Sequence, residues 1–176
     1  MTERLDILFD EDTIHAKVAE LAARITADYA GRDLVLVGVL KGAAVFLSDL
    51  ARLIALPVTV DYVRASSYGM STTSSGRVAV SRDAGTDVRG KDVLLVDTIV
   101  DTGETLARLY GMFEEKGPAS VRAVVLLDKR SRRTADVPLA YVGFELPDEF
   151  VVGYGVDRAE RYRNLPYIAV VRSADE

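Results

Sequence analysis

The sequence has no cysteine and only one histidine among its 176 residues. The lack of cysteine excludes disulfides, a thiol nucleophile and a cysteine-ligated metal site. Long hydrophobic runs are also missing, and the longest, such as residues 34–40, are far too short to cross a bilayer. The first twelve residues show no apolar stretch behind a basic head and do not resemble a signal peptide. We therefore expect no membrane association and a cytoplasmic location.

Basic residues are in the minority, with 22 Lys and Arg against 27 Asp and Glu and a formal net charge of −5. This balance argues against nucleic-acid binding through a broad basic surface, so we expect no nucleic-acid partner. Arginines still cluster at residues 130–133 and 158–163, which leaves room for a local anion site. Two common nucleotide motifs are missing: there is no GxxxxGK[ST], and residues 153–155 (GYG) lack the third glycine of a dinucleotide fingerprint.

Apolar periodicity predicts the secondary structure. The length suits one domain, residues 1–176, with a substantial core. Apolar residues at helical spacing predict helices at residues 10–30, 42–55 and 105–116. Apolar runs predict strands at residues 34–40, 57–63, 77–82, 92–97, 121–127, 141–144 and 167–171. This alternation indicates an α/β fold with a mainly parallel twisted sheet flanked by helices, and ligands at the carboxyl ends of its strands. The small polar residues 65–76 predict a mobile loop.

The most informative segment is residues 93–106, VLLVDTIVDTGETL. A buried strand runs into Asp97, the chain turns through Asp101, Thr102 and Gly103, and a helix follows. The free N–H groups at a helix start receive anions, and a glycine lets the backbone approach a ligand closely. Asp, Thr and Gly are also common in plain turns and helix caps, so the triplet alone favours the structural alternative. The entire strand–turn–helix pattern, with acids at the end of a buried strand, favours a phosphate site.

The same segment resembles the phosphoribosyl-pyrophosphate signature of type I phosphoribosyltransferases. Four more segments extend the resemblance, in order and at sensible spacing, to the bacterial hypoxanthine or hypoxanthine-guanine phosphoribosyltransferases. They are residues 40–43 (LKGA), 66–69 (SSYG), 127–130 (LDKR) and 150–165 (FVVGYGVDRAERYRNL). The resemblance implies the type I phosphoribosyltransferase fold, with a small hood and a flexible lid loop beside the main sheet.

The resemblance also implies an enzyme of purine salvage. Such a transferase moves the 5-phosphoribosyl group of 5-phosphoribosyl 1-pyrophosphate to hypoxanthine, or to guanine or xanthine. The products are IMP, or GMP or XMP, and pyrophosphate. Its cofactor is Mg²⁺, its partners are these small-molecule substrates, and family members are commonly homodimers or homotetramers.

Roles for individual residues follow from the resemblance. Asp101 is the catalytic residue, accepting the proton that the purine loses from N7, although a helix-capping aspartate is the structural alternative. Asp97 and Thr98 bind the ribose, and Asp157 and Asp97 bind magnesium. The 5′-phosphate is held by residues of the turn and the helix start: Asp101, Thr102, Gly103, Glu104, Thr105 and Leu106.

The resemblance implies that three other segments bind the pyrophosphate and the base. Lys41, Gly42 and Arg163 bind pyrophosphate, in part through a loop that carries a cis peptide in the family, and Ser67 and Tyr68 belong to the lid. A lysine ammonium only donates hydrogen bonds, so it matches a 6-oxo group and disfavours adenine. The residues that bind the purine are Lys129, Phe150, Val151 and Asp157. Without the resemblance, Lys129 would be taken for a surface lysine and Phe150 for a core residue.

The resemblance fails at two places. The family usually has Glu-Asp where this chain has Asp97 and Thr98, and an aromatic residue is common where this chain has Arg158. We expect activity to survive the first change because Asp157 and pyrophosphate hold most of the magnesium. Two other functions stay open, a nucleotide-sensing regulator with weak or no catalysis and a phosphoribosyltransferase for uracil or adenine. His15, away from every motif, is taken as structural.

Overall fold

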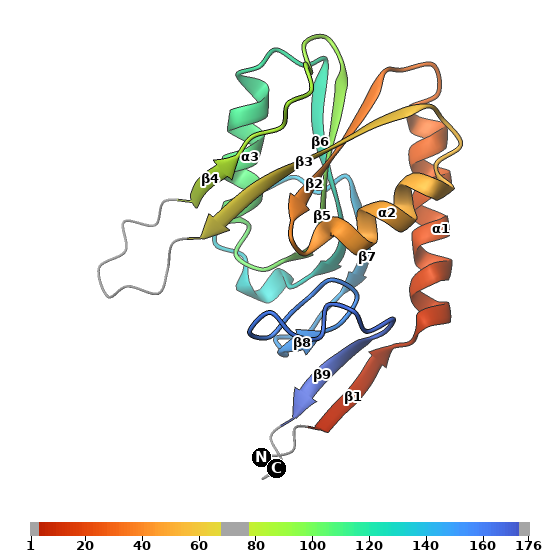
Figure 1. Cartoon of the computed structure of the whole chain (residues 1–176), viewed down its shortest axis with the longest axis vertical. Coiled ribbons are helices and arrows are strands. Elements are labelled where there is room, and N and C mark those ends of the chain that lie inside the picture. Colours follow the sequence, from red (N-terminus) through yellow and green to blue (C-terminus); the bar gives the residue numbers. More distant parts are fainter. Residues whose placement is uncertain (1–3, 68–77, 173–176) are drawn as a thin grey trace.

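The computed structural model describes residues 4–67 and 78–172. A central sheet of six strands has the order β4-β3-β2-β5-β6-β7 (Figure 1). Neighbouring strands run parallel except β3 and β4, which are antiparallel. The strands are β2 (Leu34–Leu40), β3 (Val58–Ser67), β4 (Val78–Arg82), β5 (Asp92–Val100), β6 (Ser120–Asp128) and β7 (Tyr141–Glu145).

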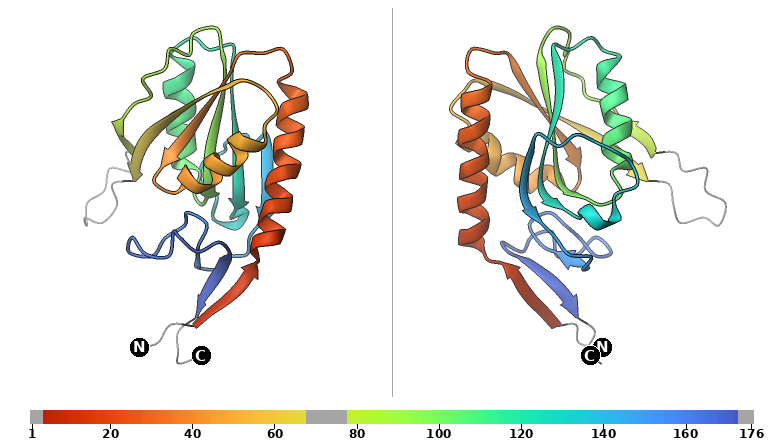
Figure 2. Two further views of the ribbon diagram at one scale, coloured as in Figure 1. Left: turned by 45° about the vertical axis from the view of Figure 1, so that its right-hand side comes forward. Right: turned by 180° about the vertical axis from the view of Figure 1, so that it is seen from behind.

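Helices cover both faces of this sheet, with α1 (Glu11–Asp28) and α2 (Ala43–Leu53) on one side and α3 (Glu104–Glu114) on the other (Figure 2). Alternate residues of the inner strands point to opposite faces, so Leu36 packs with α1 and α2 while Val35 packs with α3. This explains why β2 is apolar throughout: a strand covered on both faces has no polar side. Asp10 caps α1 by accepting a hydrogen bond from the Thr13 amide at 2.8 Å.

A second, antiparallel sheet of three strands has the order β1-β9-β8 and lies beyond the carboxyl ends of the central strands (Figure 1). Its strands are β1 (Arg4–Phe9), β8 (Val151–Val152) and β9 (Ile168–Arg172). The prediction that residues 167–171 complete the central sheet is therefore wrong. Strand β9 is antiparallel to both of its neighbours, and one of them, β1, comes from the other end of the chain. This small sheet corresponds to the expected hood.

Strand β3 is longer than its apolar pattern indicates. The predicted mobile loop began at residue 65, but Ala65 and the next two residues continue β3 and pair with β4. Cross-strand pairing thus overrides the small polar side chains that suggested a loop. The rest of the predicted loop, residues 68–76, lies outside the described residues.

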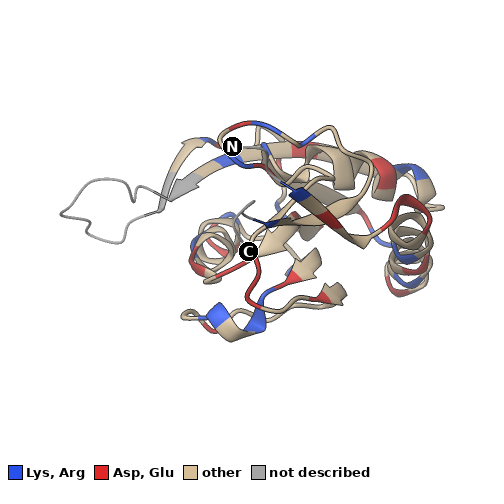
Figure 3. Ribbon diagram, turned by 90° about the horizontal axis from the view of Figure 1, so that it is seen from below, with Lys and Arg blue, Asp and Glu red and all other residues tan. Residues whose placement is uncertain are grey.

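Charged residues of both signs are interspersed along the helices and loops (Figure 3). In the described part of the chain, no helix combines the length and hydropathy needed to span a membrane.

Candidate functional site

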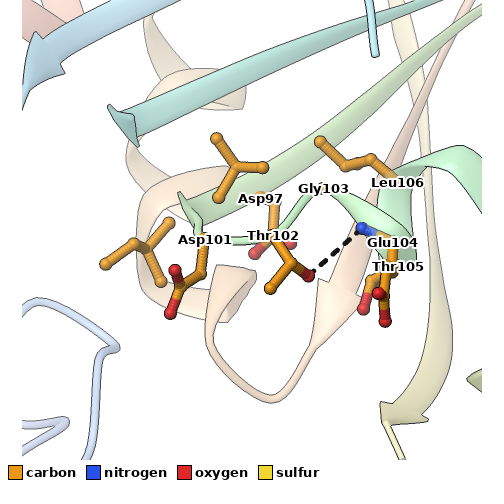
Figure 4. Close-up of a pocket in the computed structure, with 9 residues that line it drawn as sticks. Asp97, Asp101, Thr102, Gly103, Glu104, Thr105 and Leu106 are labelled. Atoms are coloured by element: carbon orange, nitrogen blue, oxygen red, sulfur yellow. Dashed lines mark hydrogen bonds between the residues drawn. The ribbon is translucent and has the colours of Figure 1, made fainter. Parts of the chain in front are cut away.

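A pocket of about 300 Å³ lies where β5 ends and α3 begins (Figure 4). None of its lining residues is basic, so an anion here is bound by main-chain N–H and hydroxyl groups. The lining residues are Asp97, Ile99, Val100, Asp101, Thr102, Gly103, Glu104, Thr105 and Leu106. The structure thus brings Asp97 and all six residues of the predicted phosphate loop into one pocket.

The turn into α3 depends on Gly103, whose φ is +86°. A Cβ built there would lie 2.7 Å from Cδ of Arg133 and 2.9 Å from the Ala135 carbonyl oxygen, so a larger residue does not fit. The Thr102 hydroxyl accepts from the Glu104 amide at 3.4 Å (Figure 4). The first turn of a helix has N–H groups without intrahelical partners, and here they meet the pocket. This is the geometry of a phosphate cradle.

Asp97 brings a carboxyl group to the edge of the phosphate cradle. Burial raises the pKa of Asp97 to about 7, and hydrogen bonds from the Thr98 and Ile99 amides oppose the shift. One of these bonds, from the Thr98 amide to Oδ1, is 2.8 Å long. Sugar hydroxyl donors or a cation would favour the ionised form. The carboxyl group is therefore suited to a ribose diol next to a bound phosphate.

Asp101 is held by two neighbouring arginines. Nε of Arg132 lies 2.9 Å from Oδ1 of Asp101, and Nη1 of Arg132 also lies 3.4 Å from Oδ1 of Asp148. Nε of Arg133 donates to the main-chain carbonyl of Asp101 at 3.4 Å, while Nη2 of Arg133 pairs with Asp128. Oδ1 of Asp101 accepts no hydrogen bond from the described residues. This oxygen is buried against Arg132, so the exposed part of the carboxylate is its other oxygen, Oδ2.

Lys129 lies beside Asp101 because their strands are neighbours. Val100 and Asp128 are paired across β5 and β6, and the Lys129 amide donates to the Val100 carbonyl at 3.0 Å. Only 7% of Lys129 is exposed, and within residues 4–67 and 78–172 its ammonium group has no hydrogen bond or ion pair. Few lysines are buried without a partner. This placement suits a donor that recognises a bound molecule.

The predicted base-stacking residue, Phe150, is exposed to 52% and precedes β8. The Leu146 amide donates to the Asp128 carbonyl at 2.8 Å, which anchors the start of this segment at the end of β6. The guanidinium of Arg158 lies 5.8 Å from the Phe150 ring centroid. Val151 is buried in β8. An exposed ring on this side of the strands is available to a planar ligand.

The predicted pyrophosphate residues meet acidic partners. The peptide between Leu40 and Lys41 is cis. Nζ of Lys41 lies 2.7 Å from Oε2 of Glu160, and Nη2 of Arg163 lies 2.8 Å from Oδ1 of Asp157 and 3.6 Å from Oε1 of Glu160. Glu160 was not among the site residues predicted from the sequence. The available signal was its position as an acidic residue within the basic stretch 158–163. The structure brings Lys41, Arg163 and Asp157 together around it.

Two predicted residues are placed differently or cannot be placed. Thr98 is fully buried and does not line the pocket; its hydroxyl donates to the Gly42 carbonyl at 3.0 Å. The predicted ribose contact of Thr98 therefore disagrees with its position. Ser67 ends β3, and Tyr68 lies outside the described residues. His15 is exposed on α1 and lines a different pocket together with Asp49 of α2, away from the pocket at β5.

The comparisons with known proteins agree on one family. Residues 5–159 match the model of the phosphoribosyl transferase domain. The chain is 44% identical to the hypoxanthine phosphoribosyltransferase of Salmonella typhimurium over the full length of both proteins. It is 47% identical to the hypoxanthine-guanine phosphoribosyltransferase of Bacillus subtilis, covering 96% of this chain and 93% of that one. A crystal structure of a Staphylococcus aureus hypoxanthine phosphoribosyltransferase has a TM-score of 0.91 and 44% identity, covering 95% and 91% of the two chains.

Proposed function

We propose that this chain, which belongs to the phosphoribosyl transferase family, transfers the 5-phosphoribosyl group of 5-phosphoribosyl 1-pyrophosphate to hypoxanthine or guanine in purine salvage. The observation that carries the proposal is the phosphate cradle at Gly103 beside Lys129, a largely buried residue whose ammonium group has no hydrogen bond or ion pair among the described residues. The names of its relatives favour an enzyme over a nucleotide-sensing regulator. Lys129 supports a 6-oxopurine over adenine, because an ammonium group cannot accept a hydrogen bond from adenine's amino group. The names of the relatives favour a purine over uracil.

The main-chain amides of residues 101–106 would hold the 5′-phosphate, and Asp97 would accept hydrogen bonds from the ribose hydroxyls. Lys41, Gly42 and Arg163 would hold the pyrophosphate, once Glu160 releases the two cations. The purine would lie between Lys129, at its 6-oxo group, and the ring of Phe150, with the Val151 backbone and Asp157 at its edge. Each substrate part thus meets a separate strand end, so the protein orients both reactants before bonds change.

In the transfer, the purine nitrogen forms a bond to C1′ of the ribose as the bond from C1′ to the pyrophosphate oxygen breaks. The purine then carries one proton too many. Asp101 would take that proton from N7 as general base, and its carboxylate would stabilise the positive charge that develops on the ribose ring. Oδ1 of Asp101 is buried against Arg132, so the exposed oxygen, Oδ2, would be the one that receives this proton.

Magnesium fits this site as a companion of the pyrophosphate. In the described part of the chain, no three acidic or histidine side chains form a metal cage. Mg²⁺ usually keeps several waters and binds through one or two carboxylates plus substrate phosphates, a donor set that Asp97 and Asp157 would complete. When bound, the ion would neutralise charge on the leaving pyrophosphate. Asp157 is now paired with Arg163, so it would exchange that partner for the ion.

The test is an assay of purified protein with 5-phosphoribosyl 1-pyrophosphate, Mg²⁺ and one base at a time. We expect pyrophosphate release and nucleotide formation with hypoxanthine or guanine, and none with adenine or uracil. Lys129→Met should raise the KM for hypoxanthine by about tenfold or more, because a base-specific hydrogen bond is lost. Tight ligand binding with no nucleotide from any base would support the regulator instead. The cytoplasmic location and the homodimer or homotetramer stay predictions.

A further inference from the structure

We infer that Thr98 is a positioning residue for the pyrophosphate loop, and that it contacts neither ribose nor magnesium. The inference rests on the proposed function, which gives Gly42 and Arg163 their roles. Thr98 is 0% exposed, and its Oγ1 donates to the Gly42 carbonyl at 3.0 Å. This hydrogen bond joins β5 to the loop that follows β2, two segments that are 56 residues apart in sequence.

The direction of the Thr98 side chain follows from strand alternation. Successive residues of a strand point to opposite faces, so when Asp97 faces the pocket, Thr98 must face away from it. On that side it meets the loop between β2 and α2.

Gly155 also packs closely against the Gly42 carbonyl. A Cβ built on Gly155 would lie 2.2 Å from that oxygen and 3.5 Å from Oγ1 of Thr98. Gly155 is also tied to Arg163, because its amide donates to the Arg163 carbonyl at 3.0 Å and its own carbonyl accepts from Nη1 of Arg163 at 2.8 Å. A continuous set of contacts therefore runs from Thr98 through Gly42 and Gly155 to Arg163.

These contacts fix the orientation of the loop. A peptide plane is rigid, and its C=O and N–H point in opposite directions. Holding the Gly42 carbonyl toward Thr98 therefore directs the N–H of Ala43, the first residue of α2, the other way. Thr98 thus orients the main chain of the pyrophosphate loop without touching the ligand.

The chemistry of the contact favours threonine over the aspartate that is usual in the resembling family. A hydroxyl donates to a carbonyl oxygen, whereas a carboxylate only accepts and would oppose it. A charge at this fully buried position would also lack a partner among the contacts that Thr98 makes. Thr98 is therefore matched to the Gly42 carbonyl and is not a weakened metal ligand.

The test compares pyrophosphate binding by calorimetry in four proteins. Thr98→Val removes the donor and keeps the shape, and we expect pyrophosphate to bind about five- to tenfold more weakly, the effect of one lost hydrogen bond. The KM for hypoxanthine should change less than about twofold, and Thr98→Ser should restore pyrophosphate binding. Thr26→Val is the control: it removes a hydroxyl that donates to the Ala22 carbonyl at 2.8 Å and accepts from the Ala55 amide at 3.1 Å, far from the site. It should leave pyrophosphate binding unchanged.

Pyrophosphate binding equal to the wild type in Thr98→Val would overturn the inference. So would a Thr98→Asp protein that binds Mg²⁺ alone more tightly and still binds pyrophosphate normally. If Thr98→Val does not fold, Thr98→Cys, with a much weaker donor of similar size, replaces it with the same expectation. Calorimetry needs no turnover, so a wild type that binds pyrophosphate but makes no nucleotide defeats the proposed function alone. A wild type that binds no pyrophosphate defeats this inference as well.

Discussion

Nε of Arg132 lies 2.9 Å from Oδ1 of Asp101, yet the two atoms form no hydrogen bond. Arg132 also forms an ion pair with Asp148, whose Oδ1 lies 3.4 Å from Nη1. The ion pair fixes the position of the Asp101 carboxylate: Oδ1 is buried against Arg132, and the half-exposed side chain keeps Oδ2 accessible to a ligand. Arg133, the next residue, holds the main chain of Asp101. Side chain and main chain of the proposed base are thus positioned independently.

Asp101→Asn tests the proposed base. An amide cannot take the proton, so we expect kcat to fall by about 10²- to 10⁴-fold. The KM for 5-phosphoribosyl 1-pyrophosphate should change by less than about threefold, because the amides of the phosphate cradle remain. Asp148→Asn, which alters the exposed partner of Arg132, is the control and should keep most of the turnover. Steady-state kinetics with each substrate varied separately provides the measurement. A large loss of binding with turnover preserved would contradict the assignment.

Gly103→Ala tests the phosphate cradle. Alanine at φ +86° is strained, and its Cβ would collide with Arg133 and the Ala135 carbonyl. We expect a loss of about 1–3 kcal/mol in the free energy of unfolding and a clear rise in the KM for 5-phosphoribosyl 1-pyrophosphate. Gly111→Ala, in α3 with open space around the new methyl group, should instead stabilise by about 0.5–1 kcal/mol. Urea unfolding and steady-state kinetics of both variants provide the measurements. Equal changes in stability and in the KM for 5-phosphoribosyl 1-pyrophosphate in the two variants would argue against the tight fit at Gly103.

Glu160→Gln tests whether Glu160 competes with pyrophosphate. The carboxylate of Glu160 contacts Lys41 and Arg163, and the hydrogen bond from Lys41 lowers its pKa, so it is ionised at neutral pH. Removing its charge should tighten pyrophosphate binding by about three- to tenfold at low salt. The effect should be smaller at about 0.5 M salt, because salt screens the interaction between exposed charges. Glu145→Gln, in an exposed pair with Arg130, serves as the control. Weaker pyrophosphate binding in Glu160→Gln would refute the competition.

Asp97→Asn tests the effect of burial on a carboxyl group. Burial raises the pKa of Asp97 from 3.8 to about 7, so between these values the folded protein holds a proton that the unfolded chain has lost. Stability therefore falls as pH rises through this window and levels off above it. Asparagine does not titrate, so the melting temperature of the variant relative to the wild type should increase from pH 5 to pH 8. The measurement is thermal unfolding with a chelator and without substrates. A difference that stays constant with pH would argue against the shift.

The phosphate cradle and the core were predictable because both depend on local sequence. The buried stripe of α1 and the apolar run of β2 follow from periodicity, and Gly103 stands where a strand meets a helix. The second sheet was only implied by resemblance. Its strand β8 has two residues, and β1 becomes a strand by pairing with β9 from the other end of the chain. Such pairings join residues far apart in sequence, and no local pattern reports them.

The sequence by itself determined the α/β class, the order of most elements and the strand–turn–helix at residues 93–106, because periodicity and turn chemistry act over a few residues. Only the tertiary structure decided that Thr98 holds the Gly42 carbonyl and that Glu160 contacts two cations. It also decided that Lys129 is largely buried, with no partner for its ammonium group among the described residues. These properties depend on which segments meet in space. A hydroxyl or a charge acquires its role from the group that it faces.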